Sequence, residues 1–256
     1  MKRSLVAVAA AVALATAFST VPAQAAPQGS LTSADSHRAG LGSGSGHGSK
    51  KTTPKKAKSP AKHSSAKHKT VKSGSKGAHV KAAQKRLLAL GYFLPKADGK
   101  YGPSTRQAIW AIQKAAGIKR SGNVNAATWK ALDRGVRPHA KSKKGYVVEV
   151  NKKRQLLMLV KNGRVVKTFN TSTGRAGWRT PSGHYRFIRQ INGVRHSRLG
   201  YLYRPKYFKG GYAVHGEYFD VPNYAASHGC VRVSNPAMNW LWGKGRMPLK
   251  TKIWLY

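Results

Sequence analysis

The sequence predicts a multidomain protein, in which a small all-α bundle of three helices is followed by a mainly-β domain, with a disordered basic linker before them. Three observations predict this order. Large apolar residues are almost absent from 26–75, apolar residues recur at helical spacing in 76–137, and short β-rich runs alternate with turns in 145–256. The stretch 138–144 then connects two folded parts of different class.

The first part of the chain, 1–25, predicts a signal peptide. Lys2 and Arg3 form a positive n-region, 5–18 is an apolar h-region, and an Ala-Gln-Ala cleavage site ends at Ala25. The apolar run of about 14 residues is shorter than the roughly 20 needed to span a bilayer. The mature protein is therefore expected to be secreted into the extracytoplasmic cell wall, with no transmembrane segment after cleavage.

The charge of the chain restricts its partners. It carries 48 Lys and Arg against 6 Asp and Glu, a formal net charge of +42, which attracts polyanions. The basic residues are spread over every segment and no nucleic-acid-binding motif is present, so nucleic acid is not an expected partner. The segment 26–75 buries too little apolar surface to fold, which predicts a disordered basic tail that contacts anionic wall polymers. Its histidines lack ligand spacing, so neither metal nor cofactor is expected.

The segment 76–137 contains two similar loop-helix units, at 98–105 and at 121–128. Each has a glycine turn, a residue suited to start a helix, and a threonine one turn later. Turn and helix residues of the segment form this pattern: Val80, Gln84, Leu87, Gly91, Tyr92, Asp98, Gly99, Tyr101, Gly102, Thr105, Gln113, Gly117, Thr128 and Trp129. The pattern resembles the peptidoglycan-binding domain family, a three-helix module. The resemblance implies glycan binding, although such bundles also serve as spacers.

From residue 145 the pattern changes to strands. Short β-rich runs are separated by turn residues, among them Asn162-Gly163, a strong hairpin signal. We expect one short helix at 236–243. Strands are expected at 146–150, 155–160, 165–169, 184–191, 201–208, 212–215, 231–233 and 252–256.

Cys230 is the only cysteine of the chain. Exported proteins commonly pair their cysteines, so a lone thiol indicates a reactive group or a link between chains. A thiol attacks carbonyls as thiolate and needs a base to take its proton. His215 ends a predicted strand, and His228 lies two residues before the cysteine. We favour His215, because a histidine on another strand can be aimed more freely.

The motif Val214-His215-Gly216 is followed by Ser227-His228-Gly229-Cys230-Val231-Arg232. This arrangement resembles the signature of the L,D-transpeptidase (YkuD-like) catalytic domain, and the resemblance runs from about 146 to 256. It implies that Cys230 attacks an L,D-peptide bond of a peptidoglycan stem peptide while His215 takes the thiol proton. The N–H groups of Gly229 and Cys230 would form the oxyanion hole, and a carbonyl near Gly216 would orient the imidazole.

The same resemblance implies that Arg232, His228 and Ser227 contact the substrate, with the planar fork of Arg232 suited to a carboxylate. Glu217 and Asp220 depart from the pattern, and are either loop residues or contacts for a substrate ammonium. The expected function is 3→3 cross-linking of stem peptides in cell-wall biogenesis and cell shape. The alternatives are an L,D-carboxypeptidase, a sortase-like transpeptidase, and a wall-binding protein without catalysis.

Overall fold

The computed structural model describes residues 68–256, which lie within one compact unit. The predicted signal peptide, 1–25, and the predicted linker as far as residue 67 lie outside the described residues. None of the helices in the described part is both long enough and apolar enough to cross a membrane.

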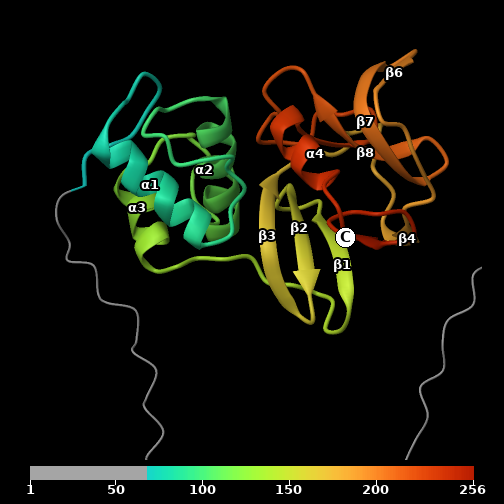
Figure 1. Ribbon diagram of the computed structural model, residues 1–256, viewed down its shortest axis with the longest axis horizontal. Helices are drawn as coiled ribbons and strands as arrows, with labels where there is room; N and C mark the ends of the chain where they lie inside the picture. The colour runs from blue at the N-terminus through green and yellow to red at the C-terminus, as the bar shows by residue number, and fades with distance from the viewer. Residues whose placement is uncertain (1–67) are drawn as a thin grey trace, which may run out of the picture. The chain divides into compact units, whose positions relative to one another are not determined.

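The first folded part is the expected bundle of three helices (Figure 1), α1 (Ala78–Ala89), α2 (Pro103–Ala116) and α3 (Ala126–Asp133). Helix α2 begins with a proline in its first turn and stops at Gly117, which adopts the left-handed conformation that glycine tolerates. Helix α3 is capped by the side chain of Asn125, which accepts a hydrogen bond from the third helical N–H.

A pair of buried glutamines explains the repeat seen in the sequence. The Gln84 carbonyl accepts from the N–H of Gly99 at 2.7 Å, and the Gln113 carbonyl accepts from the N–H of Gly122 at 3.0 Å. In both units the glutamine amide also donates to the threonine hydroxyl that follows the glycine turn. Each glutamine side chain therefore gives hydrogen-bond partners to the polar groups of a buried turn, which the backbone of its helix does not reach.

The bundle begins before the predicted boundary at residue 76. Val71 is buried in the bundle core and exchanges backbone hydrogen bonds with Val124. The indole N–H of Trp129 donates to the carbonyl of Lys69. Residues 68–75 are thus part of the folded bundle and not of a disordered linker. A single valine among basic and small residues gives no periodicity, so the sequence pattern did not indicate this.

The second folded part is the expected mainly-β domain, and it contains two sheets. In the first sheet the strand order is β3-β2-β1-β10-β4, with β1 (Tyr146–Asn151), β2 (Leu156–Lys161), β3 (Arg164–Asn170), β4 (Gly183–Arg186) and β10 (Lys252–Leu255). In the second the order is β5-β7-β8-β9, with β5 (Arg189–Gln190), β7 (Gly200–Lys209), β8 (Tyr212–Glu217) and β9 (Val231–Ser234). Helix α4 (Asn235–Leu241) packs on β7, β8 and β9.

Two details of the second sheet differ from the sequence expectation. The predicted strand 184–191 is divided into β4 and β5, which belong to different sheets, because Phe187 between them is buried in the core. Strand β6 (Val194–Ser197) was not expected, and it pairs with β7 as a hairpin. All of its side chains are exposed, so it lacks the alternation that marks a half-buried strand.

The bundle docks closely on the β domain. The loop after α1 extends the first sheet, because the N–H of Thr168 in β3 donates to Gly91 and the N–H of Phe93 donates to Thr168. Phe93 is part of the β-domain core, whereas Leu156 of β2 is part of the bundle core. Each part thus contributes an apolar side chain to the other, which stabilises their contact.

The predicted connection, 138–144, is also held in place. Glu149 of β1 is fully buried, and its carboxylate accepts hydrogen bonds from the N–H groups of Lys141 and Ser142 and from the hydroxyl of Tyr256. A buried carboxylate is tolerated only with such donors. The connection is therefore fixed against the first sheet.

Candidate active site

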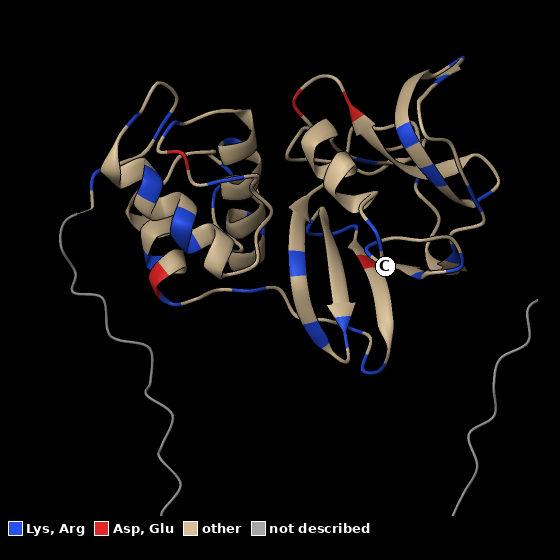
Figure 2. Ribbon diagram, viewed as in Figure 1, with Lys and Arg blue, Asp and Glu red and all other residues tan. Residues whose placement is uncertain are grey.

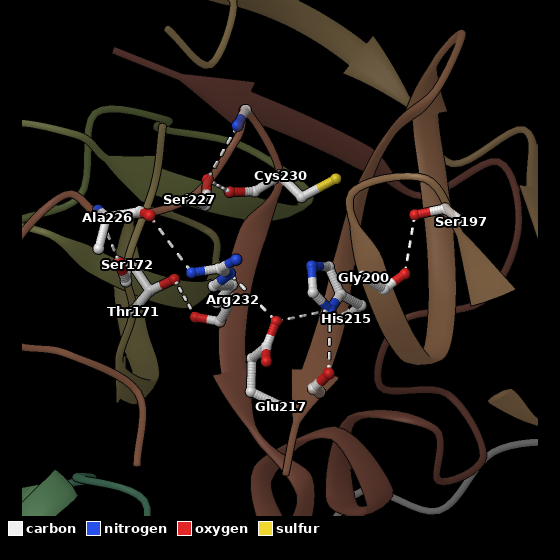
Figure 3. A network of polar contacts seen from close by, with 12 residues as sticks. Thr171, Ser172, Ser197, Gly200, His215, Glu217, Ala226, Ser227, Cys230 and Arg232 are labelled. Atoms are coloured by element: carbon white, nitrogen blue, oxygen red, sulfur yellow. Dashed lines mark hydrogen bonds and ion pairs between the residues drawn. The ribbon is translucent and has the colours of Figure 1, made fainter. Parts of the chain in front are cut away.

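The histidine singled out by the sequence lies in β8, and the cysteine directly precedes the neighbouring parallel strand β9. In the pairing of β8 with β9, Val214 lies opposite Val231 and His215 lies opposite Arg232. Because side chains alternate along a strand, the valines point into the core, and His215, Arg232 and Cys230 point to the opposite face. His215, Cys230 and Arg232 line a cleft of about 650 Å³ on that face (Figure 3).

The imidazole of His215 is deeply buried, with 3% of its surface exposed. Its Nδ1 lies 2.9 Å from the carbonyl oxygen of Gly216. A carbonyl can only accept, so Nδ1 carries the hydrogen and Nε2 remains as the basic nitrogen. Burial lowers the pKa of His215 to about 4, which outweighs the hydrogen bond to Gly216. The ring is therefore neutral at neutral pH.

The thiol of Cys230 is partly exposed, and its Sγ lies 3.8 Å from the carbonyl oxygen of Gly211. Burial raises the pKa of Cys230, against smaller lowering effects of a backbone hydrogen bond and of the Arg232 charge. The cleft thus holds a neutral thiol, which faces the Gly211 carbonyl, and a neutral imidazole, with no hydrogen bond between the two in the described part of the chain. Such a pair reacts when the imidazole accepts the proton as the sulfur attacks.

The turn before the cysteine is shaped by Ser227 and Gly229. Ser227 Oγ donates to the carbonyl of Cys230 at 2.6 Å and accepts from the N–H of Gly229 at 3.0 Å. Gly229 has a φ of 118°, and a Cβ there would lie 2.8 Å from the Tyr212 ring. Glycine is thus required for both conformation and space. Its N–H, one of the two expected oxyanion donors, is engaged by Ser227 in this arrangement.

Arg232 is paired with Glu217, an ion pair that the small number of acids in the sequence had disfavoured. Arg232 Nε lies 3.1 Å from Glu217 Oε1, as an ion pair without the alignment of a hydrogen bond, and the guanidinium also donates to the carbonyl of Ala226. Glu217 Oε1 is 3.7 Å from His215 Nδ1. Burial raises the pKa of Glu217 while Arg232 lowers it. The second unexplained acid, Asp220, pairs with Arg106 of α2.

This arrangement can be compared with known proteins. The family model described as "L,D-transpeptidase catalytic domain" matches residues 145–254, and the model described as "Putative peptidoglycan binding domain" matches 76–132. A solved structure of the L,D-transpeptidase from Xylanimonas cellulosilytica is 49% identical, with a TM-score of 0.70. The match covers 72% of this chain and 96% of that one. The chain belongs to the L,D-transpeptidase family.

Curated relatives match a shorter part of this family member. N-acetylmuramoyl-L-alanine amidase CwlL of Bacillus licheniformis is 46% identical over 84 residues, which are 32% of this chain and 23% of the amidase. An uncharacterized protein of Kitasatospora aureofaciens is 41% identical over 58 residues, 22% of this chain and 49% of that protein. This L,D-transpeptidase family member thus spans about a quarter of the length of the curated amidase.

The remaining walls of the cleft in this L,D-transpeptidase family member combine His228, which the sequence motif singled out, with residues that sequence reasoning did not single out. His228 lines the cleft with its ring edge-on to Trp178, 5.0 Å between centroids. Thr180 Oγ1 donates to the carbonyl of Gly229 at 2.7 Å and so supports the nucleophile turn. The hairpin of β6 and β7 adds arginines to the cleft, including Arg195. Only the density of arginines in 175–204 could have indicated a cationic wall.

Within residues 68–256 no group of three or more His, Cys, Asp or Glu side chains is placed to hold a metal ion. The side chains at the cleft include a thiol, an imidazole, an arginine and a buried carboxylate.

Proposed function

We propose that this protein is an exported peptidoglycan L,D-transpeptidase that forms 3→3 cross-links through a thioester on Cys230. The observation that carries the proposal is the position of Cys230 and His215 on the same face of two paired strands, at one cleft. The family membership and the second domain support peptidoglycan as the partner.

Acylation begins when Cys230 Sγ attacks the carbonyl of the L,D-peptide bond between the third residue of a tetrapeptide stem and the terminal D-alanine. As the S–C bond forms, the thiol proton moves to Nε2 of His215. The tetrahedral intermediate collapses, the C–N bond breaks, and the imidazolium returns the proton to the departing amine of D-alanine. Because the Cys230 thiol and the His215 imidazole are both neutral at the start, no charge is separated between them before the sulfur attacks.

Charge develops on the carbonyl oxygen during attack, and the turn before Cys230 supplies its stabilisation. The N–H of Cys230 is the first donor that we assign, while the N–H of Gly229 contributes once its bond to Ser227 opens. One such donor typically contributes about 3 kcal/mol. Arg232, His228 and Ser227 lie at the same wall, and we assign them to the contact with the stem peptide.

The second half-reaction decides the product. A side-chain amine of a second stem attacks the thioester and gives the 3→3 cross-link, whereas water gives an L,D-carboxypeptidase. A sortase-like transpeptidase is disfavoured because Arg232 follows Cys230 by only two residues, whereas a sortase carries its arginine on a different strand from its cysteine. A wall-binding role without catalysis is disfavoured because Cys230 and His215 are both present. Mass spectrometry of products from defined tetrapeptide stems distinguishes transfer from hydrolysis.

The direct test of the nucleophile is covalent labelling. By family resemblance, carbapenems are opened by the thiolate of L,D-transpeptidases, so intact-mass analysis is expected to find one adduct, at Cys230. Cys230→Ser is expected to lose the adduct, since imidazole alone activates a hydroxyl poorly. An adduct that persists in Cys230→Ser rejects the assignment.

Attachment to the wall is assigned to two parts. The bundle is proposed to bind the glycan, and an isolated wall stripped of anionic polymers should retain the protein if this is so. The basic tail, outside the described residues, is proposed to contact anionic wall polymers. Lys and Arg are also numerous over the described part, where Asp and Glu are few (Figure 2). Deleting 30–67, which leaves Val71 in the bundle core, should weaken retention at low salt and matter little at high salt, because counterion release drives such contacts.

A further inference from the structure

The connection between β8 and β9 determines how the catalytic pair is placed. It runs over 218–230 and contains neither helix nor strand, yet it joins the strand of His215 to Cys230. Long connections of this kind are uncommon in compact domains, and they take their order from the groups that they contact. The neighbours of this connection therefore decide where the thiol lies relative to the imidazole.

The first neighbour is Gln107 on helix α2 of the bundle. Its amide donates to the carbonyl of Val221 at 3.0 Å, and its carbonyl accepts from Asn170 of β3 at 2.6 Å. Asn170 donates to the same Val221 carbonyl at 3.2 Å. The two amide side chains are 5% and 4% exposed, so losing Gln107 removes a buried hydrogen bond to the connection and the closest acceptor of the Asn170 amide.

The second neighbour is the loop that follows α2. Arg120 Nη1 donates to the carbonyl of Asn223 at 2.7 Å, and the Asn223 amide donates back to the carbonyl of Arg120 at 3.0 Å. In the first turn of α2, Arg106 forms an ion pair with Asp220 of the connection. Three points of the connection, at 220, 221 and 223, are thus held by the bundle.

A further path leads from α2 to the strand after the cysteine. The ammonium of Lys114, 2% exposed, donates to the carbonyl of Thr171 at 3.0 Å. The Thr171 hydroxyl donates to the carbonyl of Arg232 at 2.6 Å. The next residue, Ser172, accepts from the N–H of Ala226 at 3.1 Å. Segment 171–172 therefore links the bundle to both sides of Cys230 (Figure 3).

We propose that the bundle, beyond any attachment to the wall, positions the nucleophile, with Gln107 as the positioning residue that holds the 218–230 connection against β3. Helix α2 is then part of the active-site framework. The inference takes Cys230 as the reacting thiol, and so it rests on the proposed function.

The test compares two buried glutamines of α2 in the full chain. Gln107→Leu removes the contact with Val221, whereas Gln113→Leu removes bonds to Gly122, Asn123 and Thr128 that lie wholly within the bundle. Both changes remove the hydrogen bonds of a buried glutamine side chain on the same helix. Only the first acts on the connection that carries Cys230.

Three quantities are measured for each variant: carbapenem acylation, alkylation of Cys230 by iodoacetamide from pH 6 to 9, and hydrogen exchange of peptides from 218–230. Gln107→Leu is expected to slow acylation on the order of tenfold or more, since a misplacement of about 1 Å is enough for such a loss. Hydrogen exchange in the 218–230 peptides should become faster. The pH dependence of Cys230 alkylation should follow the ionisation of an isolated thiol. Gln113→Leu should lower the melting temperature without these changes.

Equal losses of acylation in the two variants overturn the proposal, because they reflect general destabilisation. Faster exchange in 218–230 with acylation at the wild-type rate overturns it as well, and so does unchanged exchange in Gln107→Leu. If Gln107→Leu does not fold, Asn223→Ala, at a half-buried site, removes one bond to Arg120 and should give the same changes to a smaller degree. Alkylation needs only a thiol, so it reports on positioning even if the proposed peptidoglycan reaction is wrong.

Discussion

Replacing His215 by alanine separates the two ways in which Cys230 can be activated. In the structure the thiol starts neutral, because burial raises the pKa of Cys230 from its ordinary value of 9.0. Less than about 1% of the thiol is then ionised at pH 7. In the proposed mechanism, the wild-type reaction depends on the neutral imidazole of His215, which takes the thiol proton during attack.

The expected pH profiles follow from these protonation states. With a His215 pKa of about 4, the base is available above that pH, so wild-type acylation should rise near pH 4 and stay nearly flat from pH 5 to 8. In His215→Ala the rate should follow the thiolate, rising about tenfold per pH unit up to the thiol pKa. At pH 7 the loss should be roughly 10²- to 10⁴-fold, the usual size of general base catalysis.

The assay is the rate of carbapenem adduct formation by intact mass between pH 4 and 9. His228→Ala is the matched control, because that ring lies edge-on to Trp178 and is expected to keep the plateau at a lower level. The Glu217→Gln variant shows whether the buried carboxylate contributes to the fall of the acylation rate below pH 6. A wild-type rate that climbs steadily through pH 7 to 9 would refute the neutral pair. Alkaline rescue of His228→Ala without rescue of His215→Ala would reverse the choice of base.

Three other changes give separate expectations. Glu217→Gln leaves the Arg232 charge uncompensated, which lowers the pKa of the thiol, so iodoacetamide should alkylate faster at pH 7; a slower rate contradicts the ion-pair geometry. Gly229→Ala forces a positive φ and places Cβ 2.8 Å from the Tyr212 ring, so urea unfolding should detect a loss of about 1–3 kcal/mol, and acylation should fail. The lowered pKa of His215 stabilises the fold above pH 6.5, and about 3 kcal/mol should be lost as pH falls from 6.5 to 4. Urea unfolding of His215→Gln should lack that loss, and parallel curves for the two proteins argue against a buried neutral ring.

Sequence patterns were sufficient for the parts of the site that are local. Cys230 is conspicuous as a single thiol of a chain with a predicted export signal, and His215 as a histidine at a strand end before glycine. The three helices of the bundle, most of the strands and the short helix α4 were predicted with small shifts of their ends, whereas β6 was missed and the predicted strand 184–191 is divided. Each of these features depends on neighbours within a few residues, and the family motif adds the spacing.

The contacts that cross the chain were beyond those patterns. The pairing of Glu217 with Arg232 requires the parallel register of β8 and β9, which no local rule specifies. Phe93 follows the first helix without helical spacing, and nothing nearby indicates that it belongs to the β-domain core. Gln107 looks like any polar residue on a helix face until Val221 is placed beside it. The docking of the bundle was therefore missed as a whole.

The place of β10 has a consequence for how the β domain is made. It lies between β1 and β4 in the first sheet, although β1 precedes it by about 100 residues, and it pairs in parallel with β1 from Val147 to Val150. Contacts so distant in sequence slow folding, because the ends of a long segment must meet first. While the residues of the second sheet are still being synthesised, β1 has no β10 with which to pair. The first sheet is therefore completed only after 252–255 have been synthesised.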